Sequence, residues 1–148
     1  MFRGTSLLNL DVKGRLAVPA RHRDALVERC AGQLVITADS NRCLLIYPLP
    51  DWEVIEQKLE RASNLDSRVR ELQRRLIGLA VDVDMDGAGR VLIAPALREH
   101  AHLDKAVALV GQGKKFELWN KDGWDDWLKH SSGFAAGPLP AELEGFSI

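Results

Sequence analysis

The hydrophobic and polar positions along the chain predict short strands that alternate with amphipathic helices. In residues 81–86, apolar residues alternate with aspartates, which is the period of a half-buried strand. Apolar runs over 16–18 and 91–93 predict two further strands. A proline follows each run, Pro19 or Pro95, and suits the first turn of a helix because its missing N–H has no intrahelical partner there.

Helices and hairpins are predicted for the segments between these strands. A helix over residues 19–30 is expected to end near Gly32, which can adopt the left-handed conformation of a C-cap. Two later helices are expected to begin at capping residues, Asp51 and Asp122. The remaining elements are a helix through Val69, Leu72, Leu76 and Leu79, a hairpin with strands 33–38 and 43–47 around the turn 39–42, and a hairpin with strands 106–110 and 116–119 around the turn 111–114.

The chain contains an internal repeat. Residues 11–15 (Asp-Val-Lys-Gly-Arg) return as residues 86–90 (Asp-Gly-Ala-Gly-Arg), and each copy leads into an apolar run and a proline. The second copy has one more residue before its proline, which a β-bulge or a loop adjustment would absorb. Residues 45–52 match residues 117–124 in the same order, so we expect a duplicated unit.

The periodicity divides the chain into four segments. We expect a first unit over 1–62, a bridging helix over 63–80 and a second unit over 81–130. The tail over 131–148 loses the periodicity and gains small residues and proline, so it is predicted to be mobile. The mixture of short strands and helices predicts an α+β fold in which the two units share one body.

The composition is typical of a globular protein without a membrane anchor. The chain has 148 residues, of which 46% are hydrophobic. Its apolar runs are too short to cross a bilayer, and its first residues lack the apolar core of a signal peptide, so we expect a cytoplasmic protein. Cys30 and Cys43 are too far apart for a redox or metal pair and too few for a disulfide scaffold, which indicates buried thiols.

Charge is segregated along the chain, although the net charge is only −1. Residues 1–25 carry five basic side chains against two acidic ones, whereas residues 82–105 carry three basic and five acidic. A polyanion is therefore expected to meet the first turn, while the second turn completes the fold or contacts a neighbouring subunit. The basic residues expected to contact double-stranded DNA are Arg3, Lys13, Arg15, Arg21 and Arg23.

The two turns contain residues that shape the backbone and residues that are free to contact a ligand. Two aspartates, Asp11 and Asp86, are expected to shape the turns by accepting hydrogen bonds from turn N–H groups. Two glycines, Gly14 and Gly89, are expected to shape them by adopting positive φ. A turn needs no cation, so Lys13 and Arg15 are expected to contact phosphates and guanine edges in a major groove. Lys13 corresponds to Ala88, and Arg90 is expected to pack or to form an ion pair.

One patch of this size binds DNA weakly, because non-specific affinity scales with the number of phosphates neutralised. Several copies in a ring or another symmetric homo-oligomer would multiply a modest contact. The arginines of residues 68–75 are a second candidate surface, but acidic residues between them favour a solvated helix face. The four tryptophans are expected in the core or in subunit contacts, not as base-stacking platforms.

Other chemistry finds little support in the sequence. His100 and His102 lack a third ligand at metal-binding spacing, and motifs for a nucleophile or a phosphate-binding loop are absent. We therefore expect no catalytic residue, metal, cofactor, small-molecule substrate or membrane partner. The alternative to a DNA-binding protein is an oligomeric interaction or assembly protein that does not bind DNA.

Four segments of the chain resemble the MraZ family: residues 1–4, 9–19, 45–48 and 85–95. The resemblance runs from residue 1 to about residue 128 and includes both repeats. It implies a SpoVT/AbrB-like fold, in which two pseudo-symmetric units of strand, helix and hairpin form one compact β-barrel-like body with helices around it.

The resemblance also implies a function. Members of the family are cytoplasmic, nucleoid-associated regulators, often repressors, of the gene cluster for cell division and cell-wall synthesis, and they bind tandem promoter repeats as ring-like oligomers. The family's Asp-x-x-x-Arg motif maps onto Asp11 with Arg15 and equally onto Asp86 with Arg90. The motif alone therefore does not select the copy that binds DNA, and the acidic surroundings of the second copy favour the first.

Overall fold

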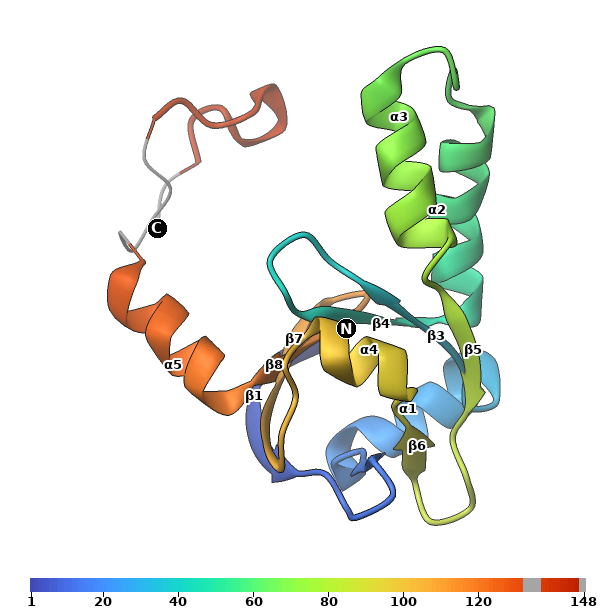
Figure 1. The fold of residues 1–148 in the computed structure, drawn as a ribbon, viewed down its shortest axis with the longest axis vertical. Coiled ribbons are helices and arrows are strands. Elements are labelled where there is room, and N and C mark those ends of the chain that lie inside the picture. Colours follow the sequence, from blue (N-terminus) through green and yellow to red (C-terminus); the bar gives the residue numbers. More distant parts are fainter. Residues whose placement is uncertain (132–136, 147–148) are drawn as a thin grey trace.

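Six antiparallel strands form the main sheet, in the order β1-β7-β8-β4-β3-β5 (Figure 1). The structure is a computed structural model that describes residues 1–131 and 137–146. The six strands are β1 (Phe2–Asn9), β3 (Gln33–Ala38), β4 (Leu44–Pro48), β5 (Val81–Asp84), β7 (Ala106–Gly113) and β8 (Phe116–Asn120). A separate two-stranded ribbon pairs β2 (Arg15–Ala17) with β6 (Arg90–Leu92). The α+β fold class is confirmed.

Strands from the two halves of the chain pair with one another. β1 pairs with β7 and β4 pairs with β8, while β5 pairs with β3 at the opposite edge of the sheet. The ribbon likewise joins one strand from each half. The two copies of the repeat thus contribute to the same sheet and the same core, although the unit boundaries at 1–62 and 81–130 remain a prediction.

The helices lie around this sheet. They are α1 (Ala20–Cys30), α2 (Leu49–Arg61), α3 (Ser67–Leu72), α4 (Pro95–His100) and α5 (Lys121–His130), with a π-helical turn η1 (Gln73–Ile77) and a 3-10 turn η2 (Ala141–Leu143). In Figure 1, α2 and α3 stand side by side at one end of the molecule, and α5 extends away from the sheet on the other side. Among the described residues, no helix combines the length and apolar character needed to span a membrane.

Apolar side chains cover both faces of the sheet. On one face lies the main core, whose most deeply buried members include Leu16, Leu26, Ile36, Leu44, Val91, Ile93, Val107, Phe116 and Leu118. On the other face, Val35, Tyr47 and Trp52 pack with residues of α2 and η1. A smaller cluster joins Cys43 and Trp119 to Trp124 of α5. Burial from both sides explains why every residue of β4 is buried.

The start of α4 shows how the second repeat accommodates its extra residue before the proline. Val18 and Ile93 make equivalent backbone hydrogen bonds, to the Gly89 and Gly14 carbonyls, and the register of the ribbon is continuous. Pro19 is the N-cap of α1, whereas Pro95 is the first residue of α4 and Ala94 is its N-cap, with nearly the same backbone angles as Pro19. The extra residue therefore needs no bulge, because the second proline simply lies one position further into its helix.

The expected caps of two other helices were wrong by two or three residues. α2 begins at Leu49 after the N-cap Pro48, so Asp51 lies in its first turn and accepts hydrogen bonds from Arg29. α5 begins at Lys121, and Asn120 is the N-cap whose side chain accepts from the N–H of Gly123. In each case the chain enters the helix straight from the strand, so the helix starts before the expected aspartate.

The other expected helix ends agree more closely with the structure. The left-handed C-cap of α1 begins one residue early, at Ala31 (φ 54°), and continues into Gly32 (φ 75°). The helix expected through Val69, Leu72, Leu76 and Leu79 is present as α3 followed by η1, but η1 ends at Ile77, so Leu79 lies beyond the helix. In the tail expected to be mobile, residues 132–136 and 147–148 lie outside the described residues, and 137–146 contain η2 and are exposed. The mobility itself stays a prediction.

Candidate nucleic-acid interface

The first turn is organised by the carboxylate of Asp11. Its Oδ1 accepts hydrogen bonds from the backbone N–H of Lys13 and of Arg15, both at 2.9 Å. Its Oδ2 accepts from Nε of Arg15 at 2.6 Å, and the Gly14 N–H donates to the Asp11 carbonyl. Because the carboxylate bonds both the backbone and the side chain of Arg15, the turn and its arginine form one rigid unit.

The second turn repeats these hydrogen bonds one for one. Oδ1 of Asp86 accepts from the N–H groups of Ala88 and Arg90 at 2.9 Å, and Oδ2 accepts from Nε of Arg90 at 3.0 Å. Gly89 donates to the Asp86 carbonyl and has φ 76°, against 81° at Gly14. The expected ion pair of Arg90 is confirmed, but Arg15 makes the same pair, so ion pairing does not distinguish the two turns.

Electrostatics keeps both turn carboxylates ionised. The backbone N–H of Arg15 is the largest cause that lowers the pKa of Asp11, and the Arg15 side chain lowers it further. The backbone N–H of Arg90 lowers the pKa of Asp86 in the same way. In each turn the carboxylate therefore balances part of the charge of its arginine. The first turn also carries the cation Lys13, whereas the second turn carries Ala88 at that position.

The ribbon brings Arg15 and Arg90 to one face. Its register pairs Arg15 with Leu92 and Ala17 with Arg90, while the residues between them, Leu16 and Val91, are fully buried. Since successive side chains of a strand point to opposite faces, both arginines lie on the outer face. In Figure 1, both turns project from the same end of the molecule, away from the end that carries α2 and α3.

The tip of the first turn is open to solvent. Val12 is fully exposed and Lys13 is also exposed, whereas Arg15 is half-buried against Asp11. The local geometry therefore presents both a cation and an apolar group outward.

The other expected contact residues lie at different places. Arg21 of α1 reaches β1, where its Nη2 donates to Oγ of Ser6 at 2.8 Å, and its Nε donates to the His22 ring. Burial, followed by the charge of Arg21, lowers the pKa of His22. Arg3 is exposed on β1. Arg23 donates from Nε to the Val18 carbonyl at 2.6 Å, next to the second turn rather than the first.

Sequence reasoning missed Arg98, which lies over the first turn. Its Nε donates to the Ile93 carbonyl at 3.0 Å, as Arg23 does to Val18. The repeat marks Arg98 as the counterpart of Arg23, because these two arginines are separated by the same 75 positions as Gly14 and Gly89, but it does not indicate which turn either arginine covers. Arg98 was counted only as one charge in an acidic segment.

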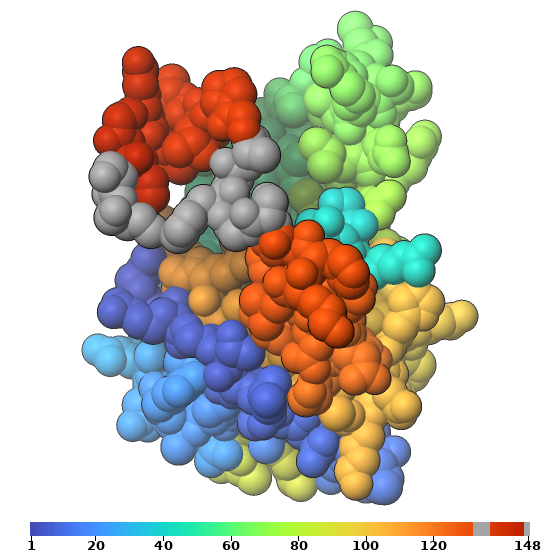
Figure 2. All heavy atoms as spheres, turned by 90° about the vertical axis from the view of Figure 1, so that its left-hand side faces the viewer, coloured from blue at the N-terminus to red at the C-terminus, as the bar shows by residue number. Residues whose placement is uncertain are grey.

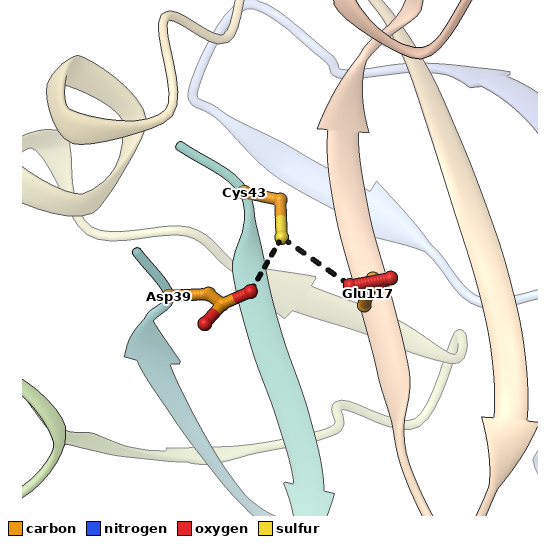
Figure 3. A group of neighbouring side chains, drawn as sticks. All are labelled: Asp39, Cys43 and Glu117. Atoms are coloured by element: carbon orange, nitrogen blue, oxygen red, sulfur yellow. Dashed lines mark hydrogen bonds between the residues drawn. The ribbon is translucent and has the colours of Figure 1, made fainter. Parts of the chain in front are cut away.

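A second group of polar side chains comes together where β3, β4 and β8 lie side by side (Figure 3). Asp39, Cys43 and Glu117 place one ligand atom each within 4.8 Å of one another, and the single S–H of Cys43 lies within hydrogen-bond reach of a carboxylate oxygen of both neighbours. Burial and the two carboxylates raise the pKa of Cys43 well above its ordinary value, so the thiol is protonated. Cys43 and Glu117 are 74 residues apart, which is why spacing did not indicate the group.

The histidines and tryptophans have separate partners. His100 contacts the Asp39 carbonyl, whereas His102 contacts Arg42, so the two rings do not converge on one site. Trp52 and Trp119 are buried, in agreement with the expected core role. Trp127 is 47% exposed on α5, which stands out from the side of the molecule seen in Figure 2. Both cysteines are buried thiols, as expected.

Comparison with known proteins gives matches over nearly all of the chain. The family model described as "MraZ protein, putative antitoxin-like" matches residues 1–75 and 76–137. The chain is 55% identical over 148 residues to "Transcriptional regulator MraZ" of Nitrosospira multiformis, and 57% identical over 152 residues to the protein of that name from Thioalkalivibrio sulfidiphilus. It is 52% identical over 152 residues to the one from Escherichia coli O9:H4. Each match covers 100% of both chains.

Proposed function

Because the chain belongs to the MraZ family, whose curated relatives are named transcriptional regulators, we propose that it is a sequence-specific DNA-binding transcriptional regulator. The observation that carries the proposal is the outer face of the β2–β6 ribbon, with Arg15, Arg90 and the nearby Lys13. A two-stranded antiparallel ribbon fits the major groove of B-DNA, where arginine reads guanine through its O6 and N7 acceptors.

The first turn makes the base contacts in this proposal. Asp11 holds the Arg15 guanidinium through Nε, so a guanine would meet the Nη side of the fork. Lys13 lies at the tip and contacts a base edge or a phosphate. Arg3, Arg21 and Arg23 contact phosphates and set the orientation of the protein on the duplex. Arg23 does so only through its Nη atoms, since its Nε bonds Val18.

The second turn has a smaller share in binding. It carries Ala88 where the first turn carries Lys13, and its surroundings are acidic. Arg90 nevertheless lies on the same ribbon face as Arg15, which supports an auxiliary contact. The ratio of the affinities of Arg15→Ala and Arg90→Ala measures this division of labour directly.

The proposal also includes the fold, the oligomer and the target genes that the family resemblance implies. The identical hydrogen bonds of the two turns support two pseudo-symmetric SpoVT/AbrB-like units in one body. A cytoplasmic, nucleoid-associated repressor of the division and cell-wall gene cluster would bind tandem promoter repeats as a ring of identical chains, because one such patch is weak alone. No catalytic activity is part of the proposal.

A gel-shift titration with the DNA upstream of the protein's own gene tests the proposal. The wild type should bind with an affinity that falls steeply with salt, and footprints should repeat at a regular spacing. Arg15→Ala should retain the fold and the oligomer, shown by circular dichroism and gel filtration, and bind the promoter about tenfold to a hundredfold more weakly. An assembly protein that does not use DNA would oligomerise normally and show no salt-dependent affinity, which would reject the proposal.

A further inference from the structure

The first turn is covered by a side chain from the other half of the sequence. Arg98 of α4 lies over Gly14, so that a Cβ placed on Gly14 would be 2.7 Å from Cζ of Arg98. The same arginine donates from Nε to the Ile93 carbonyl, and the N–H of Ile93 donates to the Gly14 carbonyl at 3.0 Å. Gly14 is consequently buried, although its neighbour Lys13 is exposed.

The second turn is covered in the same way from the first half. A Cβ on Gly89 would be 2.6 Å from Cδ of Arg23. Arg23 donates from Nε to the Val18 carbonyl, and the N–H of Val18 donates to the Gly89 carbonyl at 2.8 Å. Gly89 is buried while Ala88 is exposed. The contacts therefore cross, because each arginine lies on the turn that belongs to the opposite copy of the repeat.

These contacts give the turn glycines a second role. Positive φ alone is compatible with asparagine or aspartate, which tolerate the left-handed region better than other residues. Here a side chain of any size at position 14 or 89 would also displace a guanidinium. The absent Cβ thus lets a half-buried arginine lie directly on the backbone of the turn.

We infer that Arg98 positions the first Asp-x-x-Gly-Arg turn and Arg23 positions the second, each from the opposite half of the chain. The inference rests on the proposed function for its effect on DNA, but the positioning itself is a property of the fold. Arg98 holds Gly14 at the base of the turn, and the turn holds Arg15 through Asp11. Without Arg98, the tip must be ordered when DNA binds, and this ordering costs affinity.

Hydrogen exchange read by mass spectrometry tests the crossed arrangement. In Arg98→Ala, amides of residues 12–15 should exchange at least about tenfold faster, while those of residues 87–90 stay protected as in the wild type. In Arg23→Ala the pattern should be reversed. Arg29→Ala removes an arginine from the same helix as Arg23 and should change neither turn. Faster exchange in the arginine's own half, in both turns equally or in neither would overturn the inference.

A conservative variant separates positioning from charge. In glutamine, Nε2 occupies the place of the arginine Nε, so Arg98→Gln keeps a donor for the Ile93 carbonyl and loses the positive charge. It should restore most of the protection of residues 12–15, whereas Arg98→Met, which has similar length and no donor, should not. Loss of protection in the glutamine variant equal to that in the alanine variant would contradict a positioning role. These substitutions are milder than alanine, so they also serve if Arg98→Ala does not fold.

Salt dependence of DNA binding gives an independent readout. A residue that contacts a phosphate lowers the slope of log affinity against log salt by about 1 when it is removed. Arg98→Ala should weaken binding by about tenfold, the cost of ordering about one backbone residue, and leave the slope unchanged. A slope reduced by about 1 would make Arg98 a phosphate contact instead. If the wild type binds no DNA, the proposed function fails while the exchange experiment still judges the positioning.

Discussion

Alanine at Gly89 should destabilise the protein by an amount that follows from two separate contacts. The backbone at Gly89 has φ 76°, and a side chain in this left-handed region costs about 1–2 kcal/mol. The new Cβ would also push Arg23 away from the Val18 carbonyl, which forfeits about 1 kcal/mol for the hydrogen bond. We therefore expect the free energy of unfolding to fall by about 2–3 kcal/mol, and Tm to fall by about 4–12 °C.

Gly87 of the same turn provides a matched control. It has no positive φ, and among the described residues no atom beyond its chain neighbours lies within 4 Å of the place its Cβ would take. Gly87→Ala should therefore be neutral, or stabilise by up to about 1 kcal/mol through the unfolded chain. Urea denaturation at one fixed protein concentration measures both variants, since a concentration change would shift the midpoint of an oligomer.

The double variant Gly89→Ala, Arg23→Ala separates the two costs. Its loss should be smaller than the sum of the losses of the single variants, because the alanine side chain no longer meets the guanidinium. Equal losses in Gly87→Ala and Gly89→Ala, or a loss below about 0.5 kcal/mol at Gly89, would refute the reasoning from backbone conformation and contact.

Three further predictions follow from the site. Arg15→Ala should weaken promoter binding by about tenfold to a hundredfold in a gel shift at moderate salt, and Arg90→Ala by less; equal losses would mean that both turns contribute alike. The lowered pKa values of Asp11 and Asp86 mean that stability from these carboxylates is complete above their ordinary value of 3.8 and is lost as the pH falls through the lower folded values. The wild type should therefore have a higher unfolding midpoint than Asp11→Asn at pH 5 and at pH 7. This difference in midpoint should shrink as the pH falls below 3.8. Cys43, whose pKa is raised, should resist thiol reagents at pH 8 until the chain is unfolded in urea, and rapid labelling of the folded protein would contradict its burial.

Local patterns predicted most of the elements and the chemistry of the turns. The alternation over 81–86 corresponds to β5, and the apolar runs correspond to β2 and β6, because period and turn residues are local signals. Asp11 and Gly14 have the roles expected from turn chemistry. The pattern of residues 2–9 does not indicate β1, whose Leu7 is 59% exposed and whose length depends on pairing with β7.

Contacts between distant residues were beyond the reach of those patterns. The position of Arg98 over Gly14 depends on how the two halves meet in space, and so does the approach of Glu117 to Cys43. Helix starts were misplaced for a simpler reason. Asp51 is a good capping residue by type, but Pro48 already ends β4 and leads directly into α2.

The strand partners of the main sheet also constrain how the chain is made. Phe2 pairs with Gly113, so the first strand to leave the ribosome finds its neighbour only after residues 106–113 have emerged. Until then β1 has no strand to pair with, and closing so long a loop is slow. A nascent chain arrested before residue 106 should therefore remain dependent on chaperones. Once β7 and β8 have emerged, β7 can pair with β1 and β8 can pair with β4, which completes the sheet.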